Sequence, residues 1–244
     1  MIELKELRLN ENRLILKENI VTTPVLPKGY REIDRDVSVQ GETIVEGALY
    51  ARTLEVANGP LTVKGAVFTH TELHVNSDAG GRIEFCKSVG SAGVIVCQSS
   101  KSRVIFGADI NAKRVTLRNC FVAANVFADE VVLENCVVLG GVFAVKSISL
   151  TNVVVGTFNS PSVRAARTVN LLLPTAFSVE PLSLIPGTVI RSLALADLGA
   201  LMRGMPEKER TGAITIDPDR ETQRTVLADE AGNTSVLRSY SVAG

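Results

Sequence analysis

The chain has 244 residues, of which 45% are hydrophobic and 21% charged, a globular composition that excludes an intrinsically disordered chain. Its 26 basic and 26 acidic residues cancel, so no net field draws the protein to nucleic acid or anionic lipid. Tryptophan is absent and tyrosine occurs only 3 times. Small and β-branched residues dominate instead, and they suit a narrow all-β core better than a helical bundle.

The first forty residues read as a separate flank. They hold two alternating pieces, Leu7–Leu9 and Arg13–Leu16, followed by a break at Pro27–Gly29. The first seven residues alternate charged and apolar side chains and lack the basic start and apolar block of a signal peptide, so we expect a cytoplasmic location. We predict that residues 1–40 contain strands that cap the first turn of the next domain or pair beside it.

Residues 41–186 contain an internal repeat. Segments 110–117, 126–133 and 142–150 align with one another, and earlier copies lie at 49–56 and 67–75. Within each copy apolar and polar residues alternate, which is the pattern of a strand with one face inward. A unit of this length leaves no room for a helix between parallel strands. The repeat therefore predicts an all-β, single-stranded parallel β-helix of about eight turns, with strands about 4.8 Å apart.

Two sets of residues recur at the interval of one turn and indicate the register. Asn119, Asn135 and Asn152 form one set. The other is an apolar column that we predict to be stacked in the core: Val63, Phe85, Phe106, Val122, Val138, Val155 and Leu171. The spacing is longer between Ile83 and Val104, and we attribute the extra residues to loops at 77–81 and 98–102.

Charged residues support the same register, because a sixteen-residue period places opposite charges beside each other in successive turns. The predicted neighbours are Lys113 and Asp129, Arg114 and Glu130, Glu130 and Lys146, and Arg118 and Glu134.

The C-terminal flank, residues 187–244, changes character. Residues 192–202 have the spacing of an amphipathic helix, and residues 225–238 resemble a short hairpin around 231–233. Because the helix is short and contains Asp197, we expect it to pack on protein, and membrane contact stays open. Prolines and Glu180 interrupt the apolar stretch 171–190, which excludes a spanning helix there.

His70 and His74, the only histidines, lie on either side of Glu72 on one predicted strand. All three side chains share a face, and the two histidines are about 13 Å apart in an extended strand, too far to bind one metal ion. We read them as a solvated face and expect no metal site, no cofactor site and no catalytic residue. Motifs of the GxSxG, Walker and GxGxxG types are absent from the sequence.

The four cysteines show no CxxC spacing: Cys86, Cys97, Cys120 and Cys136. Cys120 and Cys136 occupy equivalent positions in successive turns, so their Cα atoms are expected near disulfide range. We nevertheless expect reduced, inert core thiols. Gly140 and Gly141 are assigned to a corner of the coil, where glycine relieves turn strain.

Residues 107–117 and 124–133 resemble the repeat of the bactofilin family, and the resemblance extends over about residues 41–178. It implies a right-handed β-helix that polymerises end to end, without nucleotide, into non-polar filaments with a cytoskeletal or scaffolding role. Two features depart from the family pattern. Both flanks look partly structured, and some turns are as long as 21 residues.

We therefore expect a structural protein of cell shape or envelope organisation that self-associates through its terminal turns. Partners of bactofilin type or membrane-associated proteins fit this expectation, whereas nucleic acid does not. Two alternatives stay open. One is a capped β-helix adaptor that binds or regulates a bactofilin polymer. The other is a β-helix enzyme that acts on carbohydrate or transfers acyl groups.

Overall fold

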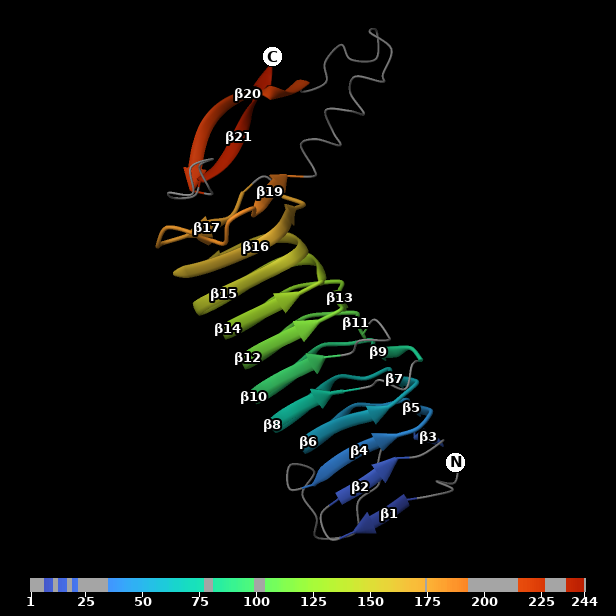
Figure 1. Cartoon of the computed structure of the whole chain (residues 1–244). Helices are drawn as coiled ribbons and strands as arrows, with labels where there is room; N and C mark the ends of the chain where they lie inside the picture. Colours follow the sequence, from blue (N-terminus) through green and yellow to red (C-terminus); the bar gives the residue numbers. More distant parts are fainter. Residues whose placement is uncertain are drawn as a thin grey trace, which may run out of the picture.

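The computed structural model describes residues 7–10, 13–16, 19–21, 35–76, 81–98, 104–173, 175–192, 215–226 and 236–243. Side chains are described for residues 15–16, 35–76, 81–98, 104–173 and 175–192. The chain forms an all-β parallel solenoid of about eight turns with flanking strands, and the turns are stacked from β2 near the N-terminus to β19 (Figure 1).

The strands are β1 (Leu7–Asn10), β2 (Arg13–Leu16), β3 (Asn19–Val21), β4 (Asp36–Gln40), β5 (Thr43–Val45), β6 (Leu49–Asn58), β7 (Leu61–Val63), β8 (Val67–Val75), β9 (Ile83–Phe85), β10 (Val89–Gln98), β11 (Val104–Phe106), β12 (Ile110–Arg118), β13 (Cys120–Val122), β14 (Val126–Glu134), β15 (Val137–Ser160), β16 (Ser162–Leu171), β17 (Phe177–Ser178), β18 (Ser183–Leu184), β19 (Val189–Ser192), β20 (Thr215–Val226) and β21 (Val236–Ala243).

Most turns combine one long strand with one short strand. Long strands such as β8, β10 and β12 pair in parallel with one another, and short strands such as β9, β11 and β13 do the same. A shift of register within β10 and β14 divides each long strand into a first half and a second half. Because every ladder hydrogen bond links one turn to the next, the main chain is satisfied along the solenoid axis.

The predicted apolar column is confirmed. Its seven members lie on the inner side of the short-strand positions and each is 0% exposed. Register pairing between successive strands connects Val63 through to Val138, and Val155 to Leu171. The rings of Phe85 and Phe106 stack with centroids 5.1 Å apart. These residues are register partners although 21 positions separate them, so the longer spacing does not disturb the stack.

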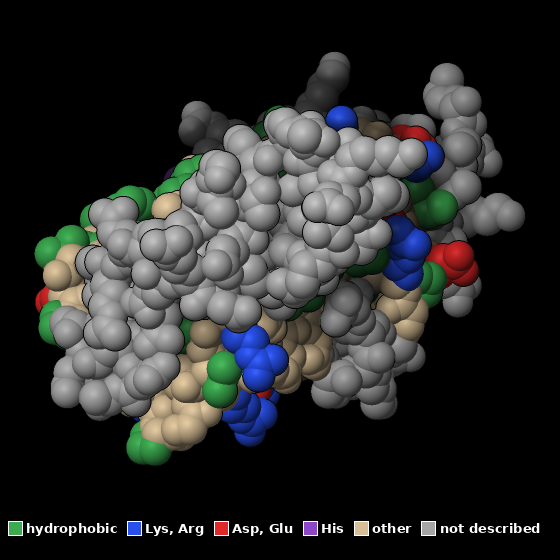
Figure 2. Space-filling view, turned by 90° about the horizontal axis from the view of Figure 1, so that it is seen from above, with side chains coloured by type: hydrophobic (Ala, Val, Ile, Leu, Met, Phe, Trp, Pro, Cys, Tyr) green, Lys and Arg blue, Asp and Glu red, His purple; other side chains and the backbone are tan. Residues whose placement is uncertain are grey.

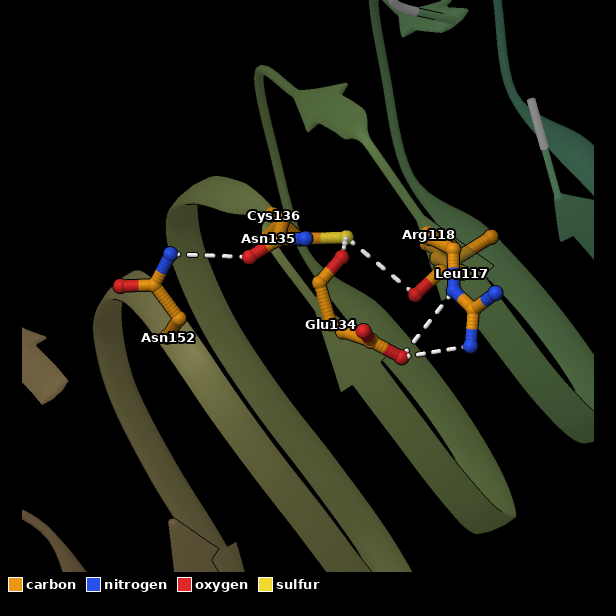
Figure 3. Close-up of polar contacts among 6 residues, drawn as sticks. All are labelled: Leu117, Arg118, Glu134, Asn135, Cys136 and Asn152. Carbon is orange, nitrogen blue, oxygen red and sulfur yellow. Dashed lines mark hydrogen bonds and ion pairs between the residues drawn. The ribbon is translucent and has the colours of Figure 1, made fainter. Parts of the chain in front are cut away.

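The recurring asparagines form a corner of the coil. Asn119, Asn135 and Asn152 have φ values of 57°, 53° and 52°, a left-handed conformation that asparagine tolerates better than most residues. Asn152 Nδ2 donates a hydrogen bond to Asn135 Oδ1 at 2.8 Å (Figure 3). Arg167 follows with φ 60°. Asparagine thus serves two purposes here, because it accepts the sharp turn and links adjacent corners.

At the corner formed by Gly140 and Gly141, the glycine at position 140 is required by close packing between turns and not by the turn strain expected from the sequence. A Cβ on Gly140 would lie 2.5 Å from Asn125 Oδ1 and 2.6 Å from Ala124 O, so the position requires close approach of the preceding turn. Asn125 Oδ1 also accepts a hydrogen bond from Gly141 N at 2.8 Å, while Asn125 N donates to Asp109 Oδ1 at 2.9 Å. These side chains join three successive corners.

The sixteen-residue charge register is confirmed between β12 and β14 and is wrong for Glu130 and Lys146. Arg114 pairs in register with Glu130, and Arg118 with Glu134, with ion pairs of 3.0 Å and 2.7 Å. The main-chain partner of Glu130 in the next turn is Ser147 rather than Lys146, because β14 and β15 shift register after Ala128.

The shift gives Lys146 a different carboxylate partner. Its Nζ lies 3.3 Å from Asp129 Oδ2 and 4.0 Å from Glu130 Oε1. Asp129 therefore forms its ion pair with the turn above it. Lys113 is in register with Asp129 one turn below, as predicted, but the two side chains form no ion pair.

The flanks contain strands on both sides. β2 pairs in parallel with β4, β3 pairs with β5, and β1 pairs antiparallel with β2. At the other end β19 pairs with β16. Parallel pairing thus extends beyond 41–186 on both sides. β20 and β21 form the predicted antiparallel hairpin, whereas the helix predicted over 192–202 lies outside the described residues except for Ser192, which ends β19.

The register predicts a contrast between two adjacent substitutions in β14. Glu130→Lys replaces an exposed ion pair by like charges and is expected to cost about 1 kcal/mol at low salt and less at high salt. Val131 is 1% exposed, and Val131→Asp is expected to cost several kcal/mol in either condition, on the order of 3 kcal/mol, by burying an unpaired carboxylate. Thermal melts at two salt concentrations measure the contrast. Equal destabilisation of the two variants would contradict this register.

The corner conformation predicts that Asn135→Ala destabilises the protein more than Asn135→Gly. Alanine in the left-handed region costs about 1–2 kcal/mol, whereas glycine tolerates it. Both variants lose the hydrogen bond from Asn152, so their difference isolates the backbone term. Asn76→Ala, at an exposed position with no positive φ, is the control. Urea denaturation measures all three variants, and a glycine variant less stable than the alanine variant would refute the explanation.

Candidate functional site

The histidines and Glu72 lie where the sequence predicts. His70, Glu72 and His74 are all exposed on β8, while Leu73 and Val75 point into the core. His74 is the register partner of Glu55 in the turn below and of Val96 in the turn above. No group of three or more His, Cys, Asp or Glu side chains in the described part of the chain could hold a metal ion. Among the same residues, no helix is long and apolar enough to cross a membrane.

The C-terminal end of the solenoid is the first candidate surface. Leu184 and Ile190 are half-buried, whereas their register partners one turn below, Ala165 and Val169, are 1% and 0% exposed. The core is thus less fully covered at these two positions of the last described turn, although Ala176 and Leu182 in the same turn stay buried. Most large apolar side chains exposed near this end belong to the same turn: Leu173, Phe177, Val179, Ile185 and Val189. Among the described residues, β17, β18 and β19 each pair only with the turn below them.

At the N-terminal end of the solenoid, part of the strand edge is already occupied. Arg35 is 1% exposed and donates hydrogen bonds from Nε and Nη2 to Tyr50 O, at 3.1 Å and 2.9 Å. A side chain therefore satisfies a carbonyl at the start of β6, where β4 is too short to provide a main-chain partner. Further out, β1 runs antiparallel along β2. Together these features occupy part of the edge that a new parallel strand would need.

An outward aromatic column is the second candidate surface. The outward residue near the start of successive long-strand positions is Tyr50, Phe68, Gly90, Asn111, Phe127, Phe143, Asn159 and Phe177. Tyr50, Phe68, Phe127 and Phe177 are exposed, and Phe143 is half-buried. Viewed from above, hydrophobic side chains are visible at the left margin of the described surface (Figure 2).

A groove of about 410 Å³ lies on this column. The rings of Phe127 and Phe143 stack with centroids 5.2 Å apart and an interplanar angle of 13°. Ala112, Ala128 and Ala144 line the groove at one position of three successive turns. Its polar lining comes from Asn111, Asp129 and Asn159. Sequence reasoning missed this surface, although Phe127 and Phe143 recur at the period of one turn, because among outward residues it followed only the charged ones and the histidines.

The thiols form a buried cluster and no disulfide. Cys97, Cys120 and Cys136 are buried and free, and Cys86 is free and half-buried. Cys136 Sγ donates to the main-chain carbonyls of Leu117 and Glu134, at 3.3 Å and 3.2 Å (Figure 3). A hydrogen bond with the Cys120 thiol, and then burial, raise the pKa of Cys136, while burial raises the pKa of Cys120. Neutral buried thiols are poor nucleophiles, so this cluster does not resemble a catalytic site.

Comparisons of the chain with protein-family models, with curated proteins and with solved structures each found no match.

The raised pKa values predict a loss of stability in alkali. Below the ordinary thiol pKa of 9.0 the folded and unfolded chains both hold the Cys136 proton. Above that pH the unfolded chain releases it while the folded chain retains it, so the free energy of unfolding falls as pH rises.

We expect Cys136→Val to reduce this fall between about pH 8 and about pH 10.5, and Cys86→Val serves as the comparison. Urea denaturation across this pH range measures the effect. A fall as steep in Cys136→Val as in the unchanged protein would contradict the assignment.

Proposed function

We propose that this chain is a structural protein that assembles without nucleotide into filaments or scaffolds, by pairing of the terminal turns of successive copies. The proposal includes no catalytic step and no cofactor. The observation that carries it is the last described turn. Within the part of the chain that the structure describes, its strands pair on one side only, and they lie beside half-buried core residues and a group of exposed apolar side chains.

Strand chemistry supports this use of the end. An open strand edge presents main-chain donors and acceptors in a row, which templates pairing with another strand. A second copy that adds there would gain main-chain hydrogen bonds and would also cover Leu184 and Ile190. Neutral net charge adds no long-range repulsion between copies.

The resemblance of residues 107–133 to the bactofilin repeat extends the proposal. We take from it a right-handed coil, non-polar filaments, a cytoplasmic location and a role in cell shape or envelope organisation. Bactofilin-type and membrane-associated proteins are the partners that this role favours.

A second candidate function is supported by the N-terminal end. Arg35 and β1 occupy part of the edge there, which favours a capped adaptor that adds to one end of a polymer rather than growing from both. The two candidates differ in what they predict for the isolated protein. A polymer subunit elongates on its own, whereas a one-sided adaptor stops at a dimer or stays a monomer.

Electron microscopy and light scattering of the purified chain, without nucleotide or metal, distinguish these cases. We expect particles that lengthen as the protein concentration rises. Val189→Lys places a charge on β19 at a side chain that is 40% exposed, and we expect shorter particles because charge on an edge strand opposes pairing. Val132→Lys is the matched control, since Val132 is 41% exposed in the middle of the solenoid.

Monomers at every salt and protein concentration would contradict self-assembly. If a chain that ends at residue 192 polymerises while the full chain does not, the C-terminal flank is a cap and the adaptor function is correct. Equal shortening by Val132→Lys would show that the end turn has no special role.

A further inference from the structure

Four successive positions of the aromatic column follow the order Asn111, Phe127, Phe143, Asn159. The two rings stack on each other, so one face of each ring is covered by its neighbour. Their other faces are turned toward the turns that carry Asn111 and Asn159, whose side chains are shorter than a phenyl ring. The groove thus has two places where an apolar ring face lies beside an amide group, one at Phe127 and Asn111 and one at Phe143 and Asn159.

Charges of both signs lie at the groove, because Lys113 is exposed and in register with Asp129, one turn below it. Asp129 is the only ionisable residue in its lining, and the Asp129 carboxylate forms an ion pair with Lys146 at 3.3 Å. Two lysines beside one carboxylate leave little net charge, and they are too few cations for the multiple phosphate contacts that bind nucleic acid. The groove therefore fits an uncharged ligand that has both apolar and hydroxyl surface.

The main chain beneath the groove has no open edge. The strands that carry the lining residues, β12, β14 and β15, pair along the solenoid axis with the turns below and above. An extended peptide laid in the groove would lose its hydrogen bonds to water without gaining main-chain partners. A pyranose ring has no such requirement, because its C–H face packs on an aromatic ring while its hydroxyl groups bond to amide side chains.

We propose that the groove binds a neutral oligosaccharide or polysaccharide, with Phe127 and Phe143 as the stacking platforms and Asn111 and Asn159 as hydroxyl ligands. This site lies on the side of the solenoid and does not depend on assembly at its ends. It is a binding site and includes no bond cleavage.

The full-length protein tests this with three probes, which are cellohexaose, chitohexaose and maltohexaose, in saturation-transfer NMR followed by titration. We expect at least one to bind. Phe127→Ala is expected to weaken that binding about tenfold, the effect of losing one aromatic contact, and Phe127→Trp is expected to retain it. Phe68→Ala is the matched control, because Phe68 stands in the same column, is also 37% exposed and lies outside the groove.

Thermal melts confirm that each variant is folded, and light scattering is recorded on the same samples. Binding by none of the three probes at millimolar concentration would overturn the proposal. So would equal weakening by Phe68→Ala. If Phe127→Ala instead abolishes lateral association of the chain and no sugar binds, the groove is an interface between copies and the proposal is wrong.

Discussion

The fold depends on one constraint, which is that equivalent residues of successive turns must lie directly above one another. Each inward side chain packs against its equivalents below and above, and each ladder hydrogen bond runs in the same direction. An added residue must therefore leave the stacked positions, either between strands or at a register shift within a long strand such as the one after Ala128. Phe85 and Phe106 illustrate this, because their rings stack in register although their turn is longer than those that follow.

The same constraint makes the ends of the solenoid different from its middle. A middle turn has a neighbour on both sides, and its inward residues are completely buried, as Val122 is. As far as the structure describes the chain, the strands of the last turn pair with a turn on one side only, and Leu184 and Ile190 are incompletely covered. In an array whose units contact only their nearest neighbours, a terminal unit needs a cap or another unit. Self-assembly and capping both satisfy the strand edge and cover the core at the end of the solenoid. The hydrogen bonds from Arg35 to Tyr50 O are a local example of capping.

Inward residues and corner residues could be predicted from the sequence, because burial requires the inward residues to be apolar and the sharp turn restricts which residues fit the corners. The column from Val63 to Leu171 had to be apolar, and its spacing gave the register. The recurrence of asparagine at the spacing of Asn135 was visible in the sequence, but its cause, the positive φ of the corner, became clear only from the structure. Outward charges were less predictable, since the register shift after Ala128 moved Lys146 by one position and no pattern of charges reveals such a shift. The aromatic groove was missed for a related reason, because outward residues obey no packing rule that a sequence displays.

Hydrogen exchange of individual main-chain amides, followed at low and at high protein concentration, tests most directly whether the open turn joins copies. At low concentration the account predicts the slowest exchange in β12, β14 and the start of β15, and faster exchange in β19. Raising the concentration should protect β19 and leave the middle strands unchanged, because only the terminal edge gains a partner. Exchange of β19 that is independent of concentration, in a protein that nevertheless forms large particles, would show that copies associate through another surface and would contradict the account.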